Sequence, residues 1–328
     1  MATLSNMVDE VLINLAGYTL QQDKSTHLVQ ALSTTTSTIA SPTVLQLAST
    51  DLGKGIIEIG EELLWVDSFD RIANTATVSP YGRGYLGTTP STAAAGTRVI
   101  ISPTFPRHSV KRAINDAIRS LGATIFAVKQ TTFTYNAAVT TYELENLNIR
   151  NILSMNWQSI GPSKEWVRVK RFDFDALPEI NTWGATSQTV TIGDTITPGR
   201  TVKVVYATEA SALDNNSDVF TTTTGLSESV RDVVVLGAAY RLLTYLDPAR
   251  AAMVSPQADE TDAKRPYGSS STATRQLFAL YTQRLAEETR AQQQQYPARV
   301  HYITFTRCNT MHSMSSGSII IGTSCFNV

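Results

Sequence analysis

Cysteine is scarce in this chain: two occur among 328 residues, Cys308 and Cys325, and both lie in the last stretch. No disulfide framework can therefore hold the fold, and an intracellular product is the simplest expectation. No run approaches the ~20 consecutive apolar residues that span a bilayer, so we expect no membrane partner. Residues 1–18 lack a basic flank and a small-residue cleavage site, which argues against a secretory signal.

Charge is sparse as well. Charged residues make up 17% of the chain, and 27 Lys and Arg stand against 28 Asp and Glu, for a formal net charge of -1. This balance argues against a protein that coats nucleic acid or an anionic membrane with its whole surface, and leaves room for a local patch or a lumen of one sign. Apolar residues make up 42%. That is a globular composition, and the length suggests about two domains.

Signatures of catalysis and metal binding are missing too. The chain has only four histidines, and no G-x-S-x-G elbow, the turn that presents a serine nucleophile in many hydrolases, stands near any predicted strand. Four residues near the end of the chain could in principle bind zinc: His301, Cys308, His312 and Cys325. Their spacing lacks the pairs of closely spaced ligands that preorganise a zinc site. We expect no catalytic residue, no metal and no cofactor.

Residues 82–87 read GRGYLG and satisfy the pattern G-x-G-x-x-G, with a predicted strand before them. Phosphate binding by this pattern requires a helix N-terminus directly after the last glycine. Here residues 88–92 read TTPST, and another strand follows. The pattern therefore predicts a Gly-rich turn.

Carboxylates occur in clusters. Asp173 and Asp175 are two apart on a predicted strand, so they share one face, while Phe172 and Phe174 take the other. A solvated sheet face explains them, although a glycan hydrolase that uses this pair of carboxylates is an alternative. An earlier group alternates with apolar residues and is explained by solvation or subunit contacts: Glu58, Glu61, Glu62, Asp67 and Asp70.

Four segments have the apolar periodicity of helices: 5–16, 107–121, 229–246 and 273–294. The second has a clean i, i+3, i+4 stripe, and Gly122 follows it as a stop. The third is apolar nearly all round, so we expect it to be a central helix covered on several sides, ended by Asp247 and Pro248. Residues 255–272, rich in Pro, Asp, Gly and Ser, predict a mobile loop.

Two blocks of short, β-branched segments lie between these helices. The first predicts a small antiparallel sheet, with strands at 56–59, 62–66, 75–78 and 98–101. The second predicts a compact sandwich or barrel, with strands at 132–135, 141–144, 152–158, 166–172, 188–192 and 201–206. Trp157, Trp166 and Trp183 could anchor its core. If these indoles were exposed instead, they would serve as stacking platforms of a receptor- or carbohydrate-binding tail protein.

Residues 83–89 read RGYLGTT, and residues 93–97 read AAAGT. With the acidic strand pair at Glu58 and Glu61–Glu62 before them, they resemble virion proteins encoded in the head–tail region of tailed double-stranded DNA bacteriophages. The order of elements continues to match over roughly residues 4–295. It includes Phe105, Pro106 and Arg107, the helix with residues AINDAI at 113–118, and GRTVKV at 199–204.

The resemblance implies a head-to-tail connector, and most directly the neck adaptor ring under the portal. Such a protein would be structural and not an enzyme, made in the host cytoplasm and located in the virion neck. Its partners would be copies of itself (a homo-oligomer of about twelve), the portal protein, a stopper or tail-completion protein, and double-stranded DNA passing through the lumen. A closed ring requires two complementary patches on each subunit.

The fold class we expect is α+β: a small helical bundle core with two inserted antiparallel β modules and an extended C-terminal arm. The expected segments are 1–40 (N-terminal helix and linker, part of the helical core), 41–106 (small antiparallel β module), 107–125 (core helix), 126–210 (β-sandwich or barrel-like module), 211–296 (C-terminal helices of the core) and 297–328 (the arm).

Two groups of residues are candidates for contacts. The arm alternates polar and β-branched residues and would form a strand where a partner offers a sheet edge. Its candidate partner-binding residues are Arg299, His301, Tyr302, Ile303, Phe305, Ile319, Ile320, Ile321 and Phe326. Basic side chains on two helices are candidates for a subunit interface or the lumen, or lie on solvated faces: Arg107, Lys111, Arg112, Arg119, Arg284 and Arg290.

Overall fold

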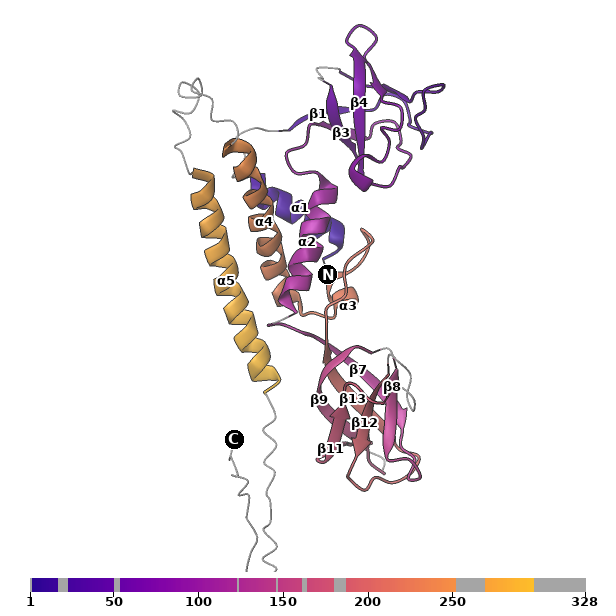
Figure 1. Ribbon diagram of the computed structural model, residues 1–328, viewed down its shortest axis with the longest axis vertical. Coiled ribbons are helices and arrows are strands. Elements are labelled where there is room, and N and C mark those ends of the chain that lie inside the picture. Colours follow the sequence, from indigo (N-terminus) through magenta and orange to yellow (C-terminus); the bar gives the residue numbers. More distant parts are fainter. Residues whose placement is uncertain are drawn as a thin grey trace, which may run out of the picture.

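The computed structural model describes residues 2–16, 23–49, 54–122, 124–145, 147–160, 164–179, 187–251 and 269–297. Figure 1 shows a β unit at one end of the molecule, helices in the middle and a second β unit at the other end. Each unit has its own cluster of buried apolar side chains.

The first β unit is a six-stranded antiparallel sheet, here called the curled sheet. Its strands pair in the order β1-β6-β3-β4-β5-β2. They are β1 (Lys24–His27), β2 (Val44–Gln46), β3 (Gly55–Ile59), β4 (Glu62–Asp70), β5 (Thr75–Val78) and β6 (Arg98–Ile101).

The curled sheet bends until its two edge strands meet. Leu28 and Leu47 directly follow β1 and β2 and form an antiparallel bridge. The Val29 amide donates to the Gln46 carbonyl at 2.8 Å, which extends this contact. The meeting encloses a core of Leu, Ile and Val side chains and leaves less unpaired strand edge open to solvent.

The second β unit is a sandwich of two antiparallel sheets around one hydrophobic cluster. One sheet has the order β10-β9-β13-β7 and the other β11-β12-β8. The strands are β7 (Ala127–Thr134), β8 (Thr141–Glu145), β9 (Ile149–Gln158), β10 (Trp166–Arg168), β11 (Phe172–Asp175), β12 (Ser187–Ile192) and β13 (Thr201–Thr208). Burial alternates along residues 201–206 of β13, as expected when one face of a sheet is covered.

The helices lie between the two β units (Figure 1). They are α1 (Leu4–Ala16), α2 (Arg107–Leu121), α3 (Phe220–Thr224), α4 (Arg231–Ala251) and α5 (Ser269–Gln295), with short 3-10 turns η1 (Tyr85–Gly87) and η2 (Glu228–Val230). The prediction that the apolar helix near 229–246 is covered on several sides is confirmed, since α4 contacts α1, α2 and α5.

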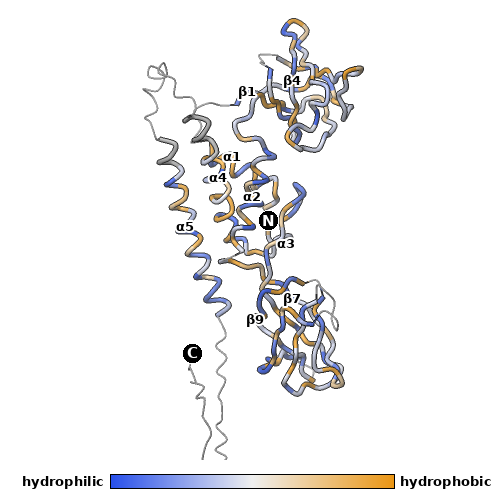
Figure 2. Tube along the Cα trace, in the orientation of Figure 1, coloured by the Kyte–Doolittle hydropathy of each residue, from blue (hydrophilic) through white to orange (hydrophobic). Residues whose placement is uncertain are grey.

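Gly237 lets α4 approach its neighbours closely. A Cβ at this position would lie 3.1 Å from Cε2 of Tyr281 on α5 and 3.3 Å from Cβ of Ala117 on α2. Such contacts are tighter than ordinary packing allows. Beyond this region α5 becomes hydrophilic towards its C-terminal end (Figure 2).

The expected fold class, an α+β protein with a small helical bundle core, is wrong. The described residues form thirteen strands in three antiparallel sheets against five α-helices, so the fold is mostly β. Two of the three hydrophobic clusters lie between strands. The sequence predicted ten strands in two blocks, so the error lies in assigning the core to the helices. A helix shows its apolar stripe in the sequence, whereas the inward side chains of short strands form a core only once the strands pair.

Individual elements were predicted with mixed success. The helix at 107–121 is confirmed with the bounds of α2. The strand at 166–172 is wrong: the chain forms β10 and then β11, which belong to different sheets. The helix expected to stop at Asp247 is wrong in its end, since α4 continues through Pro248 to Ala251. The division of the chain into six segments stays a prediction.

Candidate interaction surfaces

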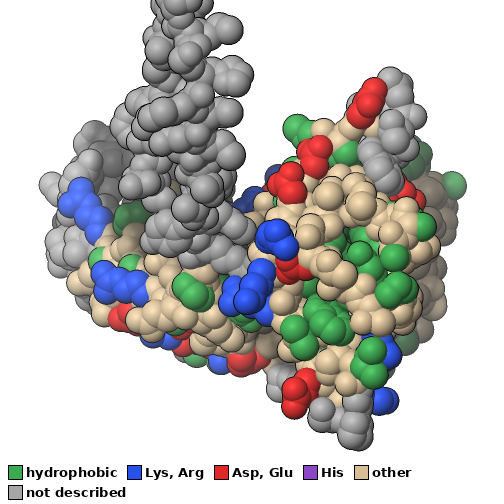
Figure 3. Space-filling model, turned by 90° about the horizontal axis from the view of Figure 1, so that it is seen from below, with side chains coloured by type: hydrophobic (Ala, Val, Ile, Leu, Met, Phe, Trp, Pro, Cys, Tyr) green, Lys and Arg blue, Asp and Glu red, His purple; other side chains and the backbone are tan. Residues whose placement is uncertain are grey.

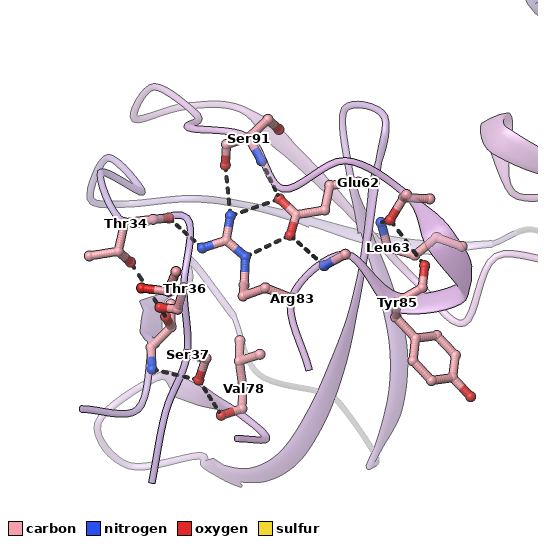
Figure 4. Close-up of polar contacts among 12 residues, drawn as sticks. Thr34, Thr36, Ser37, Glu62, Leu63, Val78, Arg83, Tyr85 and Ser91 are labelled. Atoms are coloured by element: carbon pink, nitrogen blue, oxygen red, sulfur yellow. Dashed lines mark hydrogen bonds and ion pairs between the residues drawn. The ribbon is translucent and has the colours of Figure 1, made fainter. Parts of the chain in front are cut away.

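The RGYLGTT segment, which carried the resemblance, forms a turn built on a buried ion pair (Figure 4). Nε of Arg83 lies 2.6 Å from Oε1 of Glu62, and its Nη2 lies 2.7 Å from Oε2. The two side chains are only 2% and 1% exposed. This bidentate geometry is the one in which guanidinium and carboxylate bind most strongly.

Further hydrogen bonds tie this pair to three separate stretches of backbone. Arg83 donates to the carbonyls of Thr34 and Ser91. The Glu62 carboxylate accepts from the amides of Gly84 at 3.0 Å and Ser91 at 2.9 Å. The pair therefore fixes the relative positions of the loops at 33–43 and 79–92, and every acceptor site of the carboxylate is used.

The glycines of this segment serve the turn, as predicted, and not a phosphate. Gly84 has a φ of 65°, and a Cβ there would lie 2.7 Å from the Thr88 carbonyl oxygen. Only the 3-10 turn η1 follows Gly84, and it passes into extended backbone at Thr88. No helix N-terminus is available for a phosphate at this turn.

While Arg83 is turned inward, its neighbours present apolar side chains to solvent. Tyr81 is 79% exposed and Leu86 is 63% exposed. Both have positive φ, 60° and 56°, a conformation that is unfavourable for residues other than glycine. The Tyr81 amide donates to the Ser37 carbonyl at 2.7 Å, which ties this turn to the loop carrying exposed Ile39. Strain held at exposed apolar residues is typical of contact sites.

A charged joint connects the curled sheet to the helices. Nη1 of Arg107, at the start of α2, lies 2.6 Å from Oδ1 of Asp9 on α1, and its Nε lies 3.8 Å from Glu61 in the β3–β4 turn. Lys111, one turn further along α2, also pairs with Glu61. The joint therefore links three elements by alternating charges.

Glu58 lies at the centre of this joint and is 2% exposed. Its Oε2 accepts a hydrogen bond from the Arg107 amide at 2.9 Å, so it caps the first turn of α2. Burial raises the pKa of Glu58 from its ordinary 4.5 to about 7; the Arg107 bond and charge oppose this rise, and nearby Asp23 adds to it. Burial also lowers the pKa of Lys111.

The structure corrects the interpretation of the first carboxylate cluster as solvated. Glu58 and Glu62 are both buried, one against a helix N-terminus and the other against Arg83. Their burial was missed because alternation with apolar residues leaves open which face of the sheet is covered. A glycine on each side of Arg83 was the signal that a tightly enclosed turn lay there.

The predicted basic residues divide into two groups. Arg107 and Lys111 hold the charged joint, and Arg284 lies between Asp232 on α4 and Glu287 and Glu288 on its own helix. The remaining three are exposed: Arg112, Arg119 and Arg290. A role at a subunit interface or in a lumen stays a prediction for all six.

The sandwich contains the predicted carboxylate pair and the tryptophans that were expected to anchor its core. Asp173 and Asp175 are exposed and alternate with the half-buried Phe172 and Phe174, which confirms the solvated-face interpretation. Trp157 packs against the core, whereas Trp166 is 42% exposed with the Lys203 ammonium 4.5 Å from its ring centre. Trp183 lies outside the described residues.

Seen from below, the end of the sandwich shows several hydrophobic side chains among scattered charges (Figure 3). The exposed large apolar residues of this unit are Val139, Ile160, Trp166, Val167 and Leu177. The molecule thus exposes apolar side chains at both of its β ends.

The arm residues predicted to bind a partner, and the four residues of the zinc set, lie outside the described ranges. The end of α5 is held in place: the Gln292 side chain donates to the Phe126 carbonyl at 2.7 Å and accepts from its amide at 3.2 Å. The ring centres of Phe126 and Tyr296 are 6.4 Å apart. The end of α5 therefore lies beside the segment that leads into β7.

Within the described ranges, no three His, Cys, Asp or Glu residues group in a way that could hold a metal ion. None of the helices in these ranges is both long and apolar enough to cross a membrane. No protein-family model matches the chain, and a search of curated proteins finds no significant match.

Proposed function

We propose that this protein is a structural virion component of a tailed bacteriophage. It would form a ring in the neck that joins the portal to the tail or stopper and lets the genome pass. The observation that carries the proposal is the RGYLGTT turn, the segment on which the resemblance rests. Its charged side chain is buried in an ion pair, while Leu86 within the turn and Tyr81 just before it expose large apolar side chains. Such a surface is better suited to contact with another protein than to catalysis of a reaction.

The first test is assembly of the purified full-length protein. We expect closed rings of about twelve copies, because a heterologous interface between identical subunits closes into a cyclic oligomer. Negative-stain electron microscopy and mass photometry would detect them, and labelling of the particle would place the chain at the neck. A chain that is strictly monomeric and absent from virions would refute the proposal.

A second prediction concerns the arm. Deleting residues 299–328 should leave the fold and the ring intact and abolish attachment to the neighbouring ring, since an extended segment adds main-chain hydrogen bonds to a partner. Circular dichroism would check the fold, and co-sedimentation with portal particles would measure attachment. Full attachment of the truncated protein would show that the arm has no such role.

A receptor- or carbohydrate-binding tail protein is the second candidate, and the exposed indole of Trp166 favours it. The Lys203 ammonium already covers one face of this ring, which leaves one face for a sugar to stack on. Localisation separates the two functions, because a receptor-binding protein belongs at the tail tip. A hydrolase is less well supported, since Asp173 and Asp175 are exposed and a glycosidase acid usually has a less polar environment.

A further inference from the structure

The two sheets of the sandwich carry charges of opposite sign. In the four-stranded sheet, every charged residue within the strand ranges is basic: Lys129, Arg150, Arg168 and Lys203. In the three-stranded sheet, every one is acidic: Glu143, Glu145, Asp173 and Asp175. With the whole chain near neutrality, this separation gives the sandwich a positive side and a negative side.

The outer face of the four-stranded sheet presents two of its cations together. Arg168 and Lys203 both stand opposite Asn156 in the register of β10, β9 and β13, so the three side chains lie in one row. The Lys203 contact with Trp166 puts the indole on the same face. Met155 and Val204, which alternate with this row, are buried in the core, so the row faces outward. We call it the basic face.

The basic face does not include the other two cations of this sheet. Arg150 pairs with Glu209 at 2.5 Å, and the Lys129 ammonium lies 3.4 Å from the Ser211 hydroxyl. Both cations therefore have partners within the chain, at the end of the sandwich that adjoins the helices. Arg168 and Lys203 are the cations left for an external contact.

The outer face of the three-stranded sheet presents all four of its carboxylates. Asp175 and Glu143 stand opposite Thr189 in one row across β11, β12 and β8. All four acidic residues are exposed, whereas Leu144 and Val190 of the same strands are buried in the core. We call this the acidic face.

We propose that the basic face of one copy of this chain docks on the acidic face of the next, so that copies join head to tail through their sandwiches. We assign a second copy of the chain as the partner of each face because every copy carries both a basic face and an acidic face, and these are complementary in charge. A two-fold contact through either face would instead juxtapose like charges, which costs several kcal/mol. The proposal rests on the proposed ring and names the surfaces that close it.

The geometry of a sandwich suits this arrangement. In a ring of twelve, the two contact surfaces of a subunit face directions about 150° apart. The outer faces of two packed sheets point nearly opposite ways, which approaches this angle. Contacts of this kind are charged and lie at the surface, so they should weaken as salt rises.

The test alters the charge of each face separately. Arg168→Glu with Lys203→Glu makes the basic face acidic, whereas Asp173→Lys with Glu145→Lys cancels the net charge of the acidic face, since Glu143 and Asp175 remain. Asp173 and Glu145 are chosen because Asp175 accepts the Leu177 amide and Glu143 accepts the Ser187 hydroxyl. Sedimentation velocity of the full chain should show assembly weakened at least about tenfold for each variant.

Mixing the two variants is the decisive measurement. The intact acidic face of the first variant can then bind the intact basic face of the second, so an equimolar mixture should form a one-to-one pair that neither variant forms alone. Lys54→Glu with Arg98→Glu, two exposed positions on the curled sheet, is the matched control and should assemble like the wild type. If a reversal impairs folding by circular dichroism, Arg168→Gln with Lys203→Gln tests the basic face with a smaller expected loss.

The outcomes are distinguishable. A monomeric wild-type protein would remove the proposed function and this interface with it. A wild-type ring that both reversed variants also form would overturn the interface and leave the proposed function standing. Disassembly of both variants with no pair formed on mixing would also overturn it, because the two faces would then not bind one another.

Discussion

Replacing Arg83 by Ala should destabilise the curled sheet by about 3–5 kcal/mol, because it leaves a carboxylate buried without its partner charge. Glu62 is 1% exposed and cannot turn to water. Two loop contacts, those of the Arg83 side chain with the carbonyls of Thr34 and Ser91, would be lost in the same variant. Arg83→Lys should recover only part of the loss, since an ammonium cannot reproduce the bidentate fork.

The local free energy of unfolding, measured by native-state hydrogen exchange of amides in β3, β4 and residues 84–91, reports this loss directly. The surface pair Lys54–Asp67, with atoms 4.0 Å apart and both side chains mostly exposed, provides the control. Lys54→Ala should cost less than about 1 kcal/mol.

The double variant Arg83→Met with Glu62→Leu removes both charges. It should recover only part of the stability, because the amides of Gly84 and Ser91 lose their acceptor. A loss below about 1 kcal/mol for Arg83→Ala would show that this ion pair does not hold the turn.

An element could be predicted only where its sequence has a recognisable pattern of apolar residues. The helix at 107–121 was found to the residue because its apolar stripe runs for four turns and Gly122 ends it. The strand β1 was missed because it reads KSTH and buries only Thr26. A four-residue strand with one inward side chain has no alternation to detect. Closure of the curled sheet rests on this strand, so it was missed as well.

The site was less predictable than the fold for a related reason. Glu62 and Arg83 are 21 residues apart, and pattern reasoning treats charged residues as exposed unless a partner is evident. The joint at Glu58 depends on the N-terminus of α2 lying beside the Glu58 carboxylate, a tertiary contact that no local pattern encodes. The charges on the sandwich could be read strand by strand, but their separation onto two faces required knowing which strands share a sheet.

Between about pH 4.5 and pH 7, the stability of the protein should fall as pH rises, by about 3 kcal/mol in total. The folded-state pKa of Glu58 is about 7, above its ordinary 4.5. In this window the folded protein holds a proton that the unfolded chain has released, so raising the pH favours unfolding. The groups that face Glu58 are the Arg107 amide and guanidinium and the carboxylate of Asp23.

Glu58→Gln isolates this effect, because the amide oxygen can still accept the Arg107 N–H while the side chain no longer titrates. Urea denaturation at pH 5 and pH 8 should show a variant that equals the wild type at the lower pH and exceeds its stability by up to about 3 kcal/mol at the higher. Asp67→Asn, at an exposed carboxylate of β4, should keep the wild-type slope. If Glu58→Gln also kept that slope, the proton would reside elsewhere. The charged joint would then be held by the outer pairs of Arg107 and Lys111, and Glu58 would bind the same number of protons in the folded and unfolded states at each pH in the window.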